Sequence, residues 1–134
     1  MIDTEILNYV VTTLEDADKP AMISHLLRLN KTDRYMRFFA AISDSLLISY
    51  INKLDLQKSK AFGIYNEDRS LLVAFVHVSE PEKNKGRIIS ELGISVNESH
   101  RGLGLARRLM DRSVTYCRAN DIDTLFISCL RENR

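Results

Sequence analysis

The sequence has no tryptophan, only two cysteines and two prolines, and no long apolar run. No stretch reaches the roughly 18 apolar residues of a membrane span, and residues 1–5 lack the basic and apolar regions of a signal peptide. We therefore expect a cytoplasmic protein without a membrane partner. Cys117 and Cys129 belong to no CxxC or Cys/His pair with metal spacing, so we expect two buried, reduced thiols and no metal site.

An excess of charge of either sign is also missing. Lysine and arginine number 19 against 18 aspartate and glutamate residues, which argues against nucleic acid as the main partner. At 134 residues, 45% hydrophobic and 28% charged, the chain has the composition of one ordinary globular domain spanning residues 1–134.

The first half predicts a short strand over residues 8–14 followed by three helices. Helix entries are indicated by residues that cap or open helices, namely Asp16, Asp18 and Pro20 for the first, Thr32 and Asp33 for the second, and Ser43 or Asp44 for the third. The second half predicts strands over residues 61–65, 71–78, 86–96 and 124–130, a solvated turn over residues 80–85 and an amphipathic helix over residues 105–119. The strand over residues 71–78 is apolar on both faces, which is typical of a central strand.

The strand over residues 86–96 has two different faces, because side chains alternate across a sheet. Its even positions are mostly aliphatic, whereas its odd positions include Glu91, Gly93 and Ser95. A carboxylate followed by two very small residues predicts a cleft on the odd face, since glycine inside a strand often marks the close approach of a ligand.

A glycine-rich turn joins this strand to the helix that follows. Gly102 and Gly104 precede the helix start, where the first amides have no partner within the helix and favour an anion. Arg101 adds a cation, so the turn predicts a diphosphate site. The spelling does not match a dinucleotide fingerprint, which needs a glycine where Arg107 stands, or a Walker loop, which needs G-K-[ST].

The spelling that fits is R/Q-x-x-G-x-G/A, met by Arg101, Gly104 and Ala106. With the strand before it and the helix after it, this turn closely resembles the GNAT superfamily of coenzyme A-dependent acyltransferases over residues 60–134. Residues 32–39 further resemble a segment of bacterial protein-lysine acetyltransferases. The resemblance implies an α/β (α+β) fold with a mixed, mostly antiparallel sheet and a parallel β-α-β unit for acetyl-coenzyme A.

The same resemblance implies roles for particular residues. Glu91 falls where relatives carry a general base, and this carboxylate would take the proton of a primary amine during direct attack on the thioester. The residues that would contact the coenzyme are Ile94, Ser95, Val96, Arg101, Gly102, Leu103, Gly104, Leu105, Ala106 and Asn133. The acceptor stays open between a small-molecule amine and a protein lysine. The alternative is a non-catalytic acyl-coenzyme A-binding or regulatory module in which Glu91 has no catalytic role.

The end of the sequence departs from the family pattern. Relatives continue after the position of Asn133 with a helix, which carries an acid tyrosine, and two further strands. We expect these elements to be missing here. An exposed sheet edge at this place favours a homodimer.

Overall fold

Strand β3 (Leu72–Val78) is the central strand of a six-stranded sheet in the computed structural model, which describes residues 9–127. All but one of its residues are buried, as its apolar sequence predicts. The strands follow the order β1-β2-β3-β5-β4, and β6 pairs with β5. Their bounds are Val11–Thr13 for β1, Lys60–Tyr65 for β2, Glu82–Asn84 for β4, Arg87–Val96 for β5 and Thr124–Ile127 for β6.

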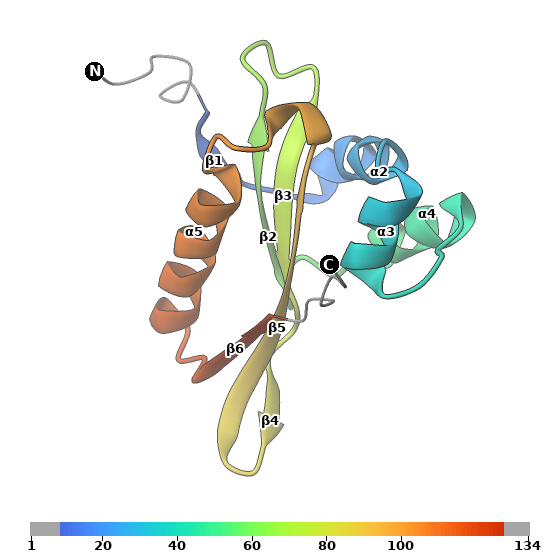
Figure 1. The fold of residues 1–134 in the computed structure, drawn as a ribbon. Helices are drawn as coiled ribbons and strands as arrows, with labels where there is room; N and C mark the ends of the chain where they lie inside the picture. Colours follow the sequence, from blue (N-terminus) through green and yellow to red (C-terminus); the bar gives the residue numbers. More distant parts are fainter. Residues whose placement is uncertain (1–8, 128–134) are drawn as a thin grey trace, which may run out of the picture.

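Helices cover both faces of this sheet (Figure 1). Helix α5 (Leu105–Ala119) packs on one face, and its residues Leu105, Leu109 and Cys117 join one buried cluster with β2 and β3. A second cluster on the other face joins the sheet to two of the helices there. The elements on that face are the short 3₁₀ turn η1 (Asp16–Asp18), α2 (Lys19–Leu27), α3 (Lys31–Phe38) and α4 (Asp44–Asn52).

The sheet is mixed, as the sequence predicts. Neighbouring strands are antiparallel except β5 and β6, which are parallel and are joined by η2 (Glu98–His100) and α5. This β5-α5-β6 unit confirms the expected fold class. None of the helices in the described residues is long and apolar enough to cross a membrane.

Three local expectations need correction. Asn30, not Thr32 or Asp33, caps α3, because its side-chain oxygen accepts a hydrogen bond from the Asp33 amide at 2.8 Å. The solvated turn predicted over residues 80–85 contains the exposed edge strand β4. The i, i+3, i+4, i+7 spacing of the helix over residues 105–119 predicts Ala106 on its packed face, but Ala106 is exposed.

The final strand is predicted over residues 124–130 as apolar on both faces, and the structure describes it as far as Ile127. Phe126 and Ile127 of β6 are 54% and 51% exposed, because β5 is the only strand with which β6 pairs in the described part of the chain. Residues 128–130 of the predicted strand lie outside that part. The final strand is therefore, as far as it is described, an edge strand with an exposed apolar surface.

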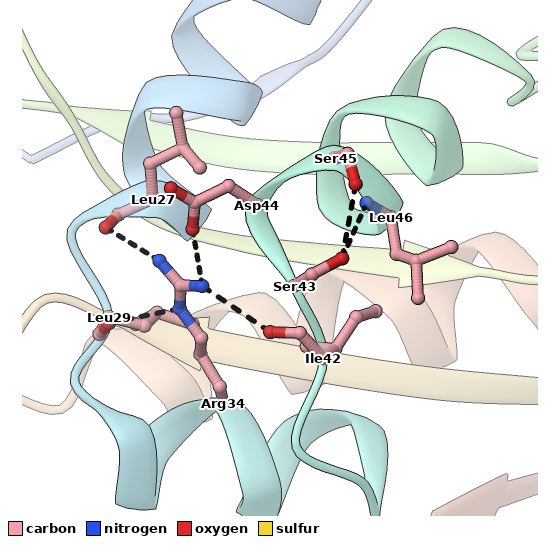
Figure 2. Close-up of polar contacts among 8 residues, drawn as sticks. All are labelled: Leu27, Leu29, Arg34, Ile42, Ser43, Asp44, Ser45 and Leu46. Atoms are coloured by element: carbon pink, nitrogen blue, oxygen red, sulfur yellow. Dashed lines mark hydrogen bonds and ion pairs between the residues drawn. The ribbon is translucent and has the colours of Figure 1, made fainter.

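Helix α3 is held in place by Arg34. Figure 2 shows its guanidinium between the end of α2 and the start of α4, where it donates to the carbonyl oxygens of Leu27, Leu29 and Ile42 at 3.1, 3.2 and 3.4 Å. It also pairs with Asp44 Oδ1 at 2.6 Å. One side chain thus joins three helices and fixes the position of α3 beside β5.

Candidate functional site

The turn before α5 has the backbone that its glycines predict. Gly102 and Gly104 have φ angles of 79° and 76°, a left-handed conformation that favours glycine. Gly104 is the N-cap of α5, a helix of 15 residues, so the amides that follow it lie at the positive end of a long helix. An added Cβ at either glycine would meet no atom within 4 Å, which leaves the space beside the turn open.

The edge of β5 nearest this turn has backbone groups without a partner strand in residues 9–127. Within these residues, β6 pairs with β5 as far as Leu92, whereas β3 pairs with β5 as far as Val96. The carbonyl of Glu91 and the amide of Asn97 both bond toward β3. Because these directions alternate along a strand, the backbone groups of Ile94 and Val96 point to the opposite edge, beyond the described end of β6.

A cleft of about 270 Å³ brings several of the predicted residues together. It is lined by Ile94, Ser95, Val96 and Arg101 from the β5 side and by Leu29, Asp33, Met36 and Arg37 from the helices opposite. Arg101 does not stand alone there, because its guanidinium pairs with the Asp33 carboxylate at 2.6 Å. The pair links the turn to α3 and leaves Arg101 49% exposed.

Ser95 lines this cleft and also contacts a buried histidine in the core. Its hydroxyl lies 2.6 Å from Nε2 of His25, whose Nδ1 lies 2.8 Å from the carbonyl oxygen of Leu72. A carbonyl only accepts, so Nδ1 carries the hydrogen and Ser95 donates to Nε2 of the neutral ring. Burial, opposed in part by the Leu72 bond, lowers the pKa of His25 to about 4. Ser95, a small residue on the odd face of β5, therefore holds the ring of the buried His25 by a hydrogen bond.

Glu91 lies four residues before this pair on the same face of β5. Its side chain is exposed and borders two cavities. One, of about 480 Å³, also takes in Phe126 of β6. The other, of about 310 Å³, contains Gly93, Arg37, Tyr50 and His77. A carboxylate at the mouth of a cavity has the position and the chemistry that a general base needs.

The second cavity contains a hydrogen-bonded chain that sequence reasoning assigned no role. Tyr50 Oη accepts from Arg37 Nη2 at 3.0 Å and lies 3.2 Å from Nδ1 of His77. His77 Nε2 lies 2.9 Å from the Ser59 hydroxyl, which in turn donates to the Asp55 carbonyl at 2.9 Å. Arg37 can only donate and the Asp55 carbonyl can only accept, so Ser59 accepts a hydrogen bond from Nε2 of His77. In a neutral His77 ring, Nδ1 then accepts from the Tyr50 hydroxyl.

Burial first, and then the nearby charge of Arg37, lower the pKa of His77 to about 4. The sequence pattern predicts for this histidine a satisfied position in the core or cleft, which the contacts confirm. Tyr50 carries no local signal of its place beside His77, because the two residues come from α4 and β3 and meet only through packing.

Two further expectations concern the coenzyme contact of Asn133 and the metal site. Asn133 lies outside residues 9–127, so its predicted coenzyme contact is not described. In the described residues, histidine, cysteine, aspartate and glutamate side chains form no group of three or more that could hold a metal ion.

Comparison with known proteins connects this site to a family. The family model described as "Acetyltransferase (GNAT) family" matches residues 23–134. Among solved structures, the GNAT domain of S. lividans PAT superposes with a TM-score of 0.76 at 17% identity, covering 93% of this chain and 74% of that one. A possible acetyltransferase from Clostridium difficile 630 gives a TM-score of 0.71 at 15% identity, covering 93% and 82%.

A predicted acetyltransferase from Clostridium acetobutylicum, solved with acetyl-CoA, gives a TM-score of 0.70 at 16% identity and covers 92% of this chain and 82% of that one. At such identities these likenesses show the fold, whereas the family model shows the family.

Proposed function

Because the chain belongs to the GNAT acetyltransferase family and is thereby an acyltransferase, we propose that it moves the acetyl group of acetyl-coenzyme A to a primary amine, with Glu91 as general base. The observation that carries the proposal is the cleft in which Ile94, Ser95, Val96 and Arg101 come together, next to a cavity bordered by Glu91. Acetyl-coenzyme A supplies the acyl donor as an activated thioester.

The proposed coenzyme site runs from the turn to the open edge of β5. The amides of residues 103–106, at the start of α5, would hold the diphosphate, and the positive φ of Gly102 and Gly104 aims the backbone toward it. Backbone groups of Ile94 and Val96 would bind the pantetheine arm as an added strand would. Arg101 would contribute its exposed guanidinium while its pair with Asp33 fixes the turn.

Glu91 would then act on the acceptor. An alkyl amine with an ordinary pKa near 10.4 is mostly protonated at neutral pH and must lose a proton before it can attack. The Glu91 carboxylate would take this proton, directly or through a water, and leave the neutral amine that attacks. After the C–N bond forms, the nitrogen would lose a second proton to solvent. A strand amide would stabilise the negative charge on the carbonyl oxygen. The C–S bond then breaks, and the departing sulfur takes a proton from solvent.

The test measures thiol release from acetyl-coenzyme A with a panel of amines, alongside coenzyme binding by calorimetry. We expect Glu91→Gln to lower kcat by about 10²–10⁴ with coenzyme affinity unchanged. Glu67→Gln is the matched control, because Glu67 is an exposed carboxylate in the turn between β2 and β3. Turnover equal to wild type in Glu91→Gln would overturn the base assignment.

Arg101→Glu tests the coenzyme site separately. The reversed charge repels both a diphosphate and Asp33, so we expect coenzyme affinity to fall by at least tenfold. Unchanged affinity would show that the turn is assigned wrongly. Coenzyme binding with no turnover on any amine would instead favour a non-catalytic acyl-coenzyme A-binding module.

A further inference from the structure

Arg37 is a cation that the described structure leaves almost without partners. Of its five N–H groups, one on Nη2 donates to the Tyr50 hydroxyl, and Nε is buried without a hydrogen-bond partner. No carboxylate forms an ion pair with it among residues 9–127. Asp33, one helical turn away on α3, is paired with Arg101 instead. A half-buried guanidinium with so few partners contributes little to folding and is able to bind an anion.

The hydrogen-bonded chain beside Arg37 does not neutralise it. The hydroxyl groups of Tyr50 and Ser59 carry no charge, and burial lowers the pKa of His77 to about 4, so its ring is neutral at pH 7. The neighbouring rings add only weak support, with the guanidinium 4.7 Å from the centre of Phe38 and 5.8 Å from that of Tyr50. The positive charge therefore stays available on the cavity side.

The guanidinium lies where the two substrates of the proposed reaction would meet. Arg37 lines both the 270 Å³ cleft with Ile94 and Val96 and the 310 Å³ cavity with Glu91. Its head group rests on Gly93, where any Cβ would overlap it. A glycine at this point of β5 is thus what gives the arginine its place beside the proposed reaction centre.

We propose that Arg37 binds an anionic group of the acceptor, so that the enzyme acts on a small amine bearing a carboxylate or phosphate close to its nitrogen. This inference rests on the proposed function. A guanidinium binds either anion through paired, charge-assisted hydrogen bonds, which neutral amines and the side chain of a peptide lysine do not offer.

The spacing along β5 limits the length of the acceptor. The Cα atoms of Glu91 and Gly93 are about 7 Å apart on one face of the strand. The Arg37 guanidinium lies over Gly93 and borders the same cavity as Glu91. The arrangement favours acceptors in which few bonds separate the amine from the anion, as in an amino acid or an aminoalkyl phosphate.

The test compares matched amines in the thiol-release assay: β-alanine against β-alaninamide, phosphoethanolamine against ethanolamine, and a lysine peptide. We expect wild-type kcat/KM to favour at least one anionic member over its neutral partner by tenfold or more. Arg37→Met should reduce that ratio to near one, and Arg37→Lys should restore it in part, because lysine keeps the charge and loses the fork. Arg118→Gln, an exposed change at the end of α5, is the control.

Gly93→Ala is an independent test, because the added methyl group must displace the Arg37 guanidinium without removing its charge. We expect it to weaken the preference for the anionic acceptor too. Calorimetry of β-alanine and phosphoethanolamine in the presence of coenzyme A reads anion binding without turnover, and we expect Arg37→Met to abolish it. Wild-type preference for the neutral amines or the peptide, or an unchanged ratio in Arg37→Met, would overturn the inference while leaving acetyl transfer intact. Absence of turnover on every amine, with anion binding retained, would overturn the proposed function instead.

Discussion

Two arginines one turn apart on α3 have opposite surroundings. Arg34 donates to three carbonyl oxygens and pairs with the Asp44 carboxylate (Figure 2), and its side chain is 16% exposed. Arg37 has one hydrogen bond, to a neutral tyrosine, and a buried Nε without a partner in the described residues. Arg34 faces the other helices, whereas Arg37 faces β5 and the two cavities.

This difference in surroundings indicates that Arg34 contributes to stability and that Arg37 contributes to the proposed function. A charged group with four hydrogen bonds to the surrounding structure stabilises the fold, because its removal leaves the acceptors unsatisfied. A charged group held in a cavity with few partners adds little to folding and is free to bind a ligand. Arg34 therefore fixes α3 against the helical layer, and α3 in turn carries Arg37 to the proposed reaction centre.

The largest effect is expected from Arg34→Met. It removes four interactions at once, and we expect the free energy of unfolding to fall by about 3 kcal/mol. Arg37→Met should stay within about 0.5 kcal/mol of wild type, because methionine keeps the packing and removes a poorly paired charge. Chemical denaturation of the two variants measures both. Equal destabilisation would contradict the division between them.

A smaller effect is expected from Asp44→Asn, which removes only the charged partner of Arg34. Asp44 is 69% exposed, so solvent screens the pair, and we expect a loss of about 0.5–1 kcal/mol. Unfolding measured at low and at high salt separates the ionic part, which should shrink as salt is added. A loss as large as that of Arg34→Met would mean that the ion pair, not the three carbonyls, anchors α3.

The different surroundings of the two arginines could not be predicted from the sequence, whereas several other features could. Periodicity predicted α5 to the residue, since its apolar face repeats along a long helix. The turn chemistry of Gly102 and Gly104 was likewise predicted and agrees with their φ angles. Strand β4 was missed because it is short, charged and fully exposed, and such a strand has no apolar alternation to detect.

Most of the acceptor side was not predicted, for a different reason. Nothing in the local sequence distinguishes Arg37 from Arg34, because the distinction depends on which distant acceptors the fold brings near each. The contact between Tyr50 and His77 joins residues 27 positions apart and depends on the packing of α4 against the sheet. Local pattern therefore predicted the turn and the helix of the proposed coenzyme site, whereas the contacts of Arg37 and Tyr50 depend on tertiary structure.

The smallest effect that tests the comparison is electrostatic. Burial and the charge of Arg37 together lower the pKa of His77 to about 4, with burial the larger cause. Arg37→Met should therefore raise this pKa toward 6.5, by less than half of the whole depression. NMR titration of the histidine side chains measures it, with His25 as internal control, because the pKa of His25 is lowered by burial and by Arg28.

The sign of the accompanying stability change follows from proton binding. Below about pH 6.5 the unfolded chain binds a proton on His77 that the folded protein takes up only near pH 4, so stability falls as pH drops through this range. A higher pKa of His77 in the folded protein narrows this pH range. Arg37→Met should therefore lose less stability than wild type as the pH falls through it. If the pKa of His77 does not change in Arg37→Met, or if the pKa of His25 shifts equally, the charge of Arg37 does not act on this cavity. The contrast with Arg34 would then rest on hydrogen bonding alone.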